Sequence, residues 1–150
     1  MTQRAYTTRR ASIVQALVTK LKEINGGGHY LSDLGGNVSP RLKFWDEVEE
    51  FPAVHLNAGS ETRVYQGGGH KDRFLSLTLR CYVQSEDSVM ALDELLEDVE
   101  TVIEENSTLM YLDRTNTSQF THQITIVSID TDEGVLEPLG VGEIALEVRY

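Results

Sequence analysis

The chain has 150 residues, a length at which one domain can bury a sizeable core without disulfides or metal ions. Its 40% hydrophobic and 25% charged residues are ordinary for a globular protein. Because the sequence has no run of about 18 apolar residues, no membrane span and no membrane partner are predicted. The length and composition therefore favour a single domain over residues 1–150, and the single cysteine excludes a disulfide-stapled scaffold.

The net charge of −11 is unevenly distributed along the chain. Residues 1–43 carry seven Lys/Arg and two Asp/Glu, whereas residues 44–150 carry six Lys/Arg and 22 Asp/Glu. Gripping nucleic acid requires clustered cations, so the acidic part is expected to repel DNA rather than bind it. The asymmetry also permits copies of the chain to attract one another head to tail, although two solvated ends explain it equally well.

The first predicted element is an amphipathic helix over residues 8–24, capped by Thr7 or Thr8 and ended by Asn25 and Gly26. Its apolar residues recur at helical spacing, namely Ile13, Val14, Leu17, Val18, Leu21 and Ile24. Residues 25–50 are predicted to be irregular. We expect anchors or a short strand there, formed by Tyr30, Leu31, Val38 and residues 42–45, with Trp45 laid over the core edge.

A long hairpin is predicted over residues 51–83, and we call its outer part, residues 61–72, the arm. Residues 53–57 are predicted to form a short strand, residues 63–65 to extend the arm outward, and the glycine-rich residues 66–71 to form its tip. A flexible segment is expected over residues 59–72. From Arg73 a half-buried strand alternates, with Leu75, Leu77, Leu79, Cys81 and Val83 on the buried face. The lone Cys81 is therefore interpreted as a small core residue.

A second helix is predicted over residues 86–106, with Ser85 as its cap. Its core stripe comprises Val89, Leu92, Leu96, Val99 and Ile103, flanked by Leu95 and Val102. The opposite face is expected to be solvated and carries nine acids: Glu86, Asp87, Asp93, Glu94, Glu97, Asp98, Glu100, Glu104 and Glu105.

Two further strands are predicted at residues 122–130, with both faces covered, and at residues 141–150, where strict alternation reaches the last residue. The order of elements predicts an α+β fold. We expect a mainly antiparallel sheet, two principal helices packed on one of its faces, and the long β-hairpin arm.

No reactive group is predicted anywhere in the chain. The histidines His29, His55, His70 and His122 lack metal-ligand spacing, and the glycine runs at residues 26–28 and 67–69 lack the strand–loop–helix context of a phosphate loop. Asp130, Asp132 and Glu133 lack the spacing of a calcium loop. No catalytic, cofactor-binding or metal-binding residue is therefore assigned, and the protein is not expected to be an enzyme.

A reaching arm without a reactive group favours assembly as the role of this chain. The predicted interface combines the arm with the basic N-terminus: Glu61, Arg63, Tyr65, Gln66, Gly67, Gly68, Gly69, His70, Lys71, Asp72, Arg9 and Arg10.

Three blocks of sequence resemble the tail terminator, or tail completion, proteins of long-tailed bacteriophages. The first is the helix pattern from Arg10 to Ile24. The second is FPAVHLNAGSE at residues 51–61, followed by CYVQSED and ALDELLEDVETVI, and the third is the ending GVLEPLGVGEIALEVRY. Each block is a pattern of fold residues rather than a diagnostic motif.

The resemblance implies a virion protein, assembled in the host cytoplasm, that forms a homohexameric ring at the head-proximal end of the tail. Such a ring stops tube growth and offers a docking surface to the neck. Its implied partners are other copies of itself, the tail tube protein, a neck or head-completion protein, and the sheath in contractile tails. DNA would be passing cargo, and Glu94, Glu97 and Asp98 are predicted to face the lumen.

Two other classes of protein fit the same residues. One is a different neck, adaptor or tube-related virion protein, and the other is a small cellular α+β ligand-binding module.

Overall fold

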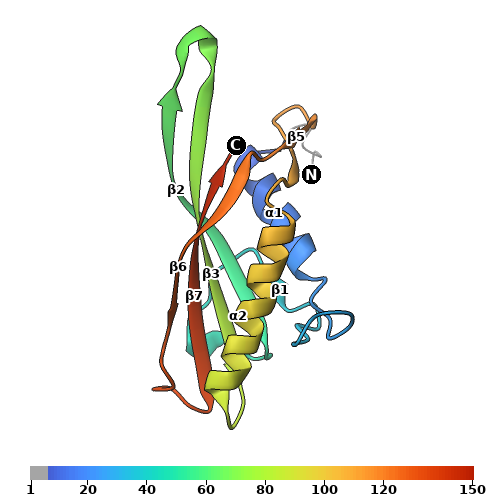
Figure 1. Cartoon of the computed structure of the whole chain (residues 1–150), viewed down its shortest axis with the longest axis vertical. Coiled ribbons are helices and arrows are strands. Elements are labelled where there is room, and N and C mark those ends of the chain that lie inside the picture. The colour runs from blue at the N-terminus through green and yellow to red at the C-terminus, as the bar shows by residue number, and fades with distance from the viewer. Residues whose placement is uncertain (1–6) are drawn as a thin grey trace, which may run out of the picture.

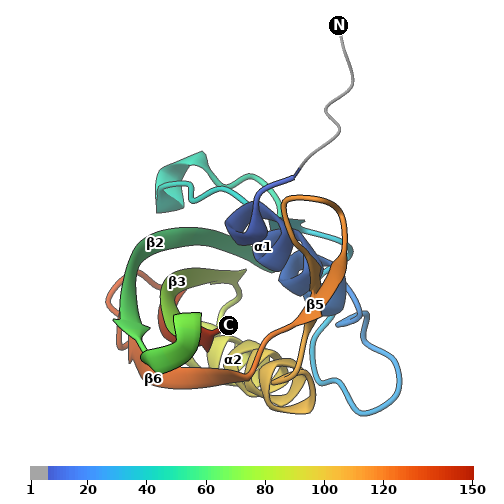
Figure 2. The ribbon, with the colours of Figure 1, turned by 90° about the horizontal axis from the view of Figure 1, so that it is seen from above.

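A strongly bent five-stranded sheet with two helices on one of its faces forms the fold (Figure 1). The structure is a computed structural model that describes residues 7–150, apart from the side chain of Trp45. Seen along the long axis, the sheet curves round the two helices (Figure 2). The predicted α+β class and the packing of both helices on one face are confirmed.

The helices are α1 (Arg9–Leu21) and α2 (Ser88–Glu105), with short 3₁₀ turns at Trp45–Glu47 and Gly67–Gly69. The strands are β1 (Val38–Ser39), β2 (Ala53–Tyr65), β3 (Lys71–Gln84), β4 (Met110–Leu112), β5 (Ser118–Phe120), β6 (Gln123–Thr131) and β7 (Leu139–Arg149). The main sheet has the order β1-β2-β3-β7-β6, with β1–β2 the parallel pair. The hairpin of β4 and β5, which periodicity did not predict, stands apart from it.

The core lies between the helices and the sheet. Helix α1 buries its predicted apolar stripe, and Thr8 is the N-cap, accepting a hydrogen bond from the Ala11 amide at 3.1 Å. In β3 the buried residues alternate from Leu75 to Val83 as predicted, and in β7 they alternate from Ile144 to Tyr150. Cys81 is fully buried, which raises the pKa of its thiol to about 12.

Both helices are shorter than predicted. Helix α1 ends at Leu21, before the expected stop at Asn25 and Gly26. The cap of α2 is Asp87, which accepts from the Met90 amide at 3.1 Å, rather than Ser85. The Ser85 amide donates instead to the carbonyl of Pro138, so this residue belongs to the turn before the helix. Val89, predicted as part of the core stripe, is 45% exposed, so this part of the prediction is wrong.

Residues 40–52, which we call the strap, cross the helix-free face of the sheet. The Tyr82 hydroxyl donates to the Lys43 carbonyl at 2.5 Å, and a ring nitrogen of His55 lies 3.1 Å from the Arg41 carbonyl. Under the strap, Val48, Ala53 and Tyr82 form a second, small buried cluster. The strap explains why Tyr82 is buried on the face where alternation predicted half-exposed residues.

The anchors predicted within residues 25–50 are correct only in part. Val38 is buried in β1 and Tyr30 packs against the core, but Leu31 and Phe44 are exposed. Leu34, which the sequence did not single out, is fully buried instead. The prediction for the Trp45 side chain lies outside the described residues.

Strand β6 forms one edge of the main sheet and pairs with β7 alone. The expectation that both of its faces are covered is wrong, because Val127 is 62% and Ile129 is 40% exposed. Helix α2 lies mainly over β3 and β7 and leaves most of the edge strand uncovered. Among the described residues, no helix is long and apolar enough to cross a membrane.

Candidate interaction surface

The arm is a two-stranded ribbon that projects past one end of the body (Figure 1). Strand β2 runs without interruption to Tyr65, and its outer half pairs with β3 from Glu61↔Leu75 to Tyr65↔Lys71. Residues 59–65 and 71–72 of the expected flexible segment lie in strands, and the tip outside the paired ladder is confined to residues 66–70. At that tip Gly68 and Gly69 have φ values of 76° and 82°, which glycine adopts without strain.

Every residue from Thr62 to Lys71 is exposed, on both faces of the ribbon. The predicted interface residues of the arm, from Arg63 to Lys71, thus lie together on a free surface. Val64 is 49% and Tyr65 is 71% exposed, while the Lys71 ammonium lies 5.9 Å from the centre of the Tyr65 ring. An isolated two-stranded hairpin is only marginally stable in water, whereas this ribbon continues two strands of the five-stranded sheet.

A polar cluster at the base of the arm fixes its direction. The Glu61 carboxylate accepts hydrogen bonds from the Tyr150 hydroxyl and, at 2.8 Å, from Arg63. On the other strand, Asp72 accepts from Arg149 at 3.2 Å and from Gln66 at 3.2 Å. Both predicted acids of the interface are therefore engaged inside the chain.

The pKa values of this cluster follow from its contacts. Burial acts to raise the pKa of Glu61, but the hydrogen bonds from Tyr150 and Arg63 outweigh it and leave that pKa below its ordinary value. The hydrogen bond from Arg149 lowers the pKa of Asp72. Burial, followed by the bond to Glu61, raises the pKa of Tyr150. Glu61 and Tyr150 thus form a carboxylate–phenol pair that fastens β2 to the end of the chain.

Of the two N-terminal residues predicted for the interface, Arg9 and Arg10, Arg10 contacts the strand that leads into the arm. Its guanidinium donates to the Gly59 carbonyl at the β-bulge between Ala58 and Glu61. Arg9 lies on the same first turn of α1, half-exposed. Sequence reasoning missed two arginines at the base of the arm, Arg73 and Arg149. The Arg73 guanidinium lies 5.5 Å from the centre of the Tyr150 ring. Only the strand register brings these residues to the arm, and the register is not visible in the sequence.

The three acids predicted to face a lumen differ in their surroundings. Glu97 is exposed and Glu94 is half-buried beside Leu31 and Ser32. Asp98 is only 2% exposed, so its assignment to a solvated face is wrong. Its carboxylate accepts from the Leu31 amide at 3.0 Å and from the Ser32 amide at 2.7 Å, and so ties residues 31–32 to α2.

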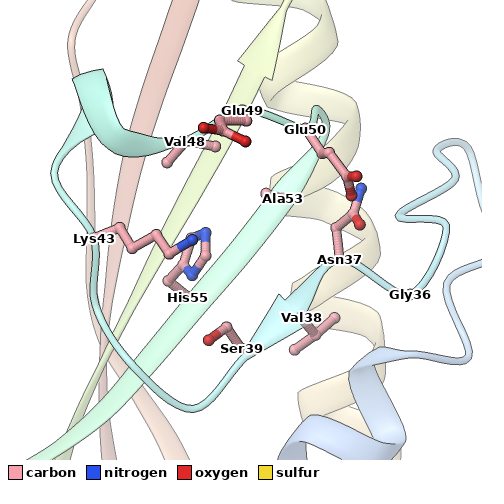
Figure 3. Close-up of a pocket in the computed structure, with 10 residues that line it drawn as sticks. All are labelled: Gly36, Asn37, Val38, Ser39, Lys43, Val48, Glu49, Glu50, Ala53 and His55. Carbon is pink, nitrogen blue, oxygen red and sulfur yellow. The ribbon is translucent and has the colours of Figure 1, made fainter.

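A hollow of about 310 Å³ lies between the strap, β1 and β2. Figure 3 shows Lys43 beside His55 at one side and Glu50 beside Asn37 at the other. Burial lowers the pKa of His55, so its imidazole is neutral at physiological pH. Within residues 7–150 no three His, Cys, Asp or Glu side chains are grouped so that they could hold a metal ion.

Comparison with known proteins identifies the family to which this architecture belongs. The sequence model of the family described as Bacteriophage Tail Tube Terminator Protein matches residues 7–150. The chain is also 36% identical over 149 residues to the tail tube terminator protein p142 of Escherichia phage T5, a match that covers 94% of this chain and 92% of that protein. The chain belongs to the bacteriophage tail tube terminator family.

The fold of this terminator also occurs in a solved virus-like particle. A chain of the virion of a native gene transfer agent particle superposes with a TM-score of 0.61, covering 94% of this chain and 96% of that chain. Its sequence identity of 8% means that the likeness shows a shared fold alone. Family membership confirms the resemblance read from the sequence, makes the terminator a structural protein of the virion tail, and decides against a cellular ligand-binding module.

Proposed function

We propose that this terminator forms a closed ring at the head-proximal end of the tail, stops polymerisation of the tail tube and offers a docking surface to the neck. The observation that carries this proposal is the arm. A projecting ribbon exposed on both faces from Thr62 to Lys71 suits contact with a neighbouring chain, and family membership supports the tail as the place of that contact. The partners are other copies of the chain, the tube protein and a neck or head-completion protein, with the sheath as a further partner in a contractile tail.

A ring of identical chains needs two different complementary surfaces on each chain, so that contacts run head to tail and close. The terminator offers two such surfaces on different strands. The arm projects past one end of the body, whereas β6 runs along the edge of the sheet farthest from β1 (Figure 1). Six copies of the 16.8 kDa chain would give a ring of about 101 kDa.

The exposed Glu97 and the half-buried Glu94 of α2 are assigned to the lumen in this proposal. Glu94 and Glu97 lie on the helix side of the sheet, and carboxylates along a channel repel the phosphates of passing DNA. Asp98 is not part of this assignment, because its carboxylate is buried against residues 31–32.

Gold labelling of the chain in intact virions tests the position of the ring. A label at the head–tail junction is expected. A label at the distal tip, or repeated along the tube, would contradict the proposal. Light scattering on the purified protein, alone and after release from tails, measures the ring mass, and a particle far from about 101 kDa would exclude the hexamer.

A further inference from the structure

Strand β6 is an open sheet edge. Nothing in the described part of the chain pairs with its outer side, and it contains neither proline nor lysine, the residues that commonly guard an edge. Six of its nine residues are β-branched, and the apolar Val127 and Ile129 are exposed. Its guarding features are Asp130 and a β-bulge between Ile126 and Ser128, and on both sides of the bulge the register with β7 is regular. Such an edge is a template for pairing with another strand.

The opposite end of the sheet is guarded. Strand β1 pairs with β2 at Val54 and His55, and farther along β2 the Arg10 guanidinium caps the bulge at Gly59. Beyond this point, from Thr62 to Tyr65, the outer edge of β2 has no pairing partner among the described residues and every residue is exposed. The strand edges of the arm and of β6 are therefore both open to pairing.

The two edges also carry complementary charge. Residues 62–71 contain Arg63 and Lys71 and no carboxylate, but Arg63 is paired with Glu61, so Lys71 is the cation of the arm that has no ion-pair partner among the described residues. Asp130 on β6 pairs across the sheet with Glu143, and Thr125 pairs with Glu147, so acids line the strands beside the open edge. Among the described residues neither Asp130 nor Glu147 has an ion-pair partner, and the chain as a whole has a net charge of −11.

We infer that the arm of one copy pairs with β6 of the next copy, so that the sheet continues from subunit to subunit round the ring. Main-chain hydrogen bonds join Thr62–Tyr65 to the outer edge of β6. Val64 and Tyr65, which point to opposite faces of the strand, extend the two faces of the sheet past Val127 and Ile129, and Lys71 faces the acids beside β6. This inference rests on the proposed ring and names the contact that closes it. A strand added to a free edge gains affinity from backbone hydrogen bonds and selectivity from side-chain pairs.

Photo-crosslinking in assembled tails tests the contact. A Val64→Cys variant is labelled with a benzophenone maleimide, and the native Cys81 does not compete because it is fully buried. Tails are assembled from a mixture of ¹⁵N-labelled and unlabelled copies, irradiated and digested for mass spectrometry. We expect adducts that join residue 64 of one copy to residues 123–131 of a copy with the other isotope label.

A Leu31→Cys variant is the matched control, because Leu31 is 62% exposed but lies in a loop away from the arm. It should give no adduct with β6 of another copy. Adducts of residue 64 with the tube protein, or with any other surface of the terminator, in tails that are still terminated would overturn the inference and leave the proposed function intact. Absence of the terminator from the tail end would instead contradict the proposed function.

A second variant tests the same contact without chemical labelling. Val127→Lys places a guarding cation at an exposed bulge position, so the chain should fold as the wild type does. We expect at least a tenfold loss in the fraction of tail ends occupied. Val135→Lys, at a turn residue that is 83% exposed, should leave occupancy unchanged. Wild-type occupancy with Val127→Lys would overturn the inference.

Discussion

Asp98 shows how one residue of the acidic helix differs from its neighbours. Its carboxylate is buried and accepts three hydrogen-bond donors of residues 31 and 32, two amides and the Ser32 hydroxyl. The sequence places it among nine acids of one helix face and gives no sign of this role. Two of the three donors are backbone amides of an irregular loop, and no residue pattern shows where such a loop returns to the helix.

Replacing Asp98 with Asn should destabilise the fold by about 2–3 kcal/mol, the scale of a buried charged hydrogen-bond acceptor that is lost. The side-chain NH₂ group of Asn would place a hydrogen-bond donor opposite the donors of Leu31 and Ser32, where the carboxylate of Asp98 offers an acceptor. Urea unfolding measures the change, and Glu97→Gln is the control because its side chain is exposed and should change stability by less than about 0.5 kcal/mol. Equal effects of the two variants would show that Asp98 does not hold the loop.

The Glu61–Tyr150 pair makes stability depend on pH. Because the pKa of Glu61 in the fold is below its ordinary value of 4.5, the ionised form contributes stability that is complete above that value. This contribution is lost as the pH falls through the folded-state pKa. The stability difference between wild type and Glu61→Gln should therefore be larger at pH 7 than at pH 3, as measured by urea unfolding. Tyr150→Phe, which removes the donor, should reduce this pH dependence, and a difference independent of pH would contradict the assignment.

At the scale of elements, the sequence predicts what the core requires. Both helices, β3 and β7 were predicted because each buries one face, so hydrophobicity repeats with the period of the element. The outer half of β2 is exposed on both faces and therefore has no such repeat, which is why the sequence indicates separate pieces at residues 53–57 and 63–65 rather than one continuous strand to Tyr65. The same reason hid the exposed strand β5. For the arm, the polar and glycine-rich composition is therefore a better predictor of an exposed hairpin than hydrophobic periodicity is.

Shortening the arm should separate folding from assembly. Val64 and Asp72 are direct partners across the hairpin, so an Asn-Gly turn can replace residues 65–71. All of the removed residues are exposed, and Asp72 keeps its bond to Arg149, so the melting temperature should change by no more than a few degrees. Tail termination should be lost, as measured by tail lengths in electron micrographs. His70→Ala keeps the arm length and is the control; normal tails with the shortened arm would show that the arm is dispensable.

At the scale of the whole molecule, the two faces of the sheet carry acids in different settings. Helix α2 presents Glu94 and Glu97 on one side, whereas the strap presents Glu49 and Glu50 on the other. Composition predicted an acidic body but could not assign its acids to faces, since that depends on which face each segment crosses. A ring that DNA traverses would place only one of these two pairs along the channel.

The double variant Glu94→Lys and Glu97→Lys should separate tail assembly from DNA passage. It changes the net charge of each chain from −11 to −7, and in a hexamer the changes of six chains add along one channel. Tails should be terminated normally, because neither residue belongs to the arm or to β6, while infectivity falls since phosphates are held where they had been repelled. The double variant Glu49→Lys and Glu50→Lys makes the same change in charge on the other face and should leave infectivity near that of the wild type. If the strap variant impaired DNA delivery as strongly as the helix variant, the total charge of the ring rather than a lumen lined by α2 would govern the passage of DNA.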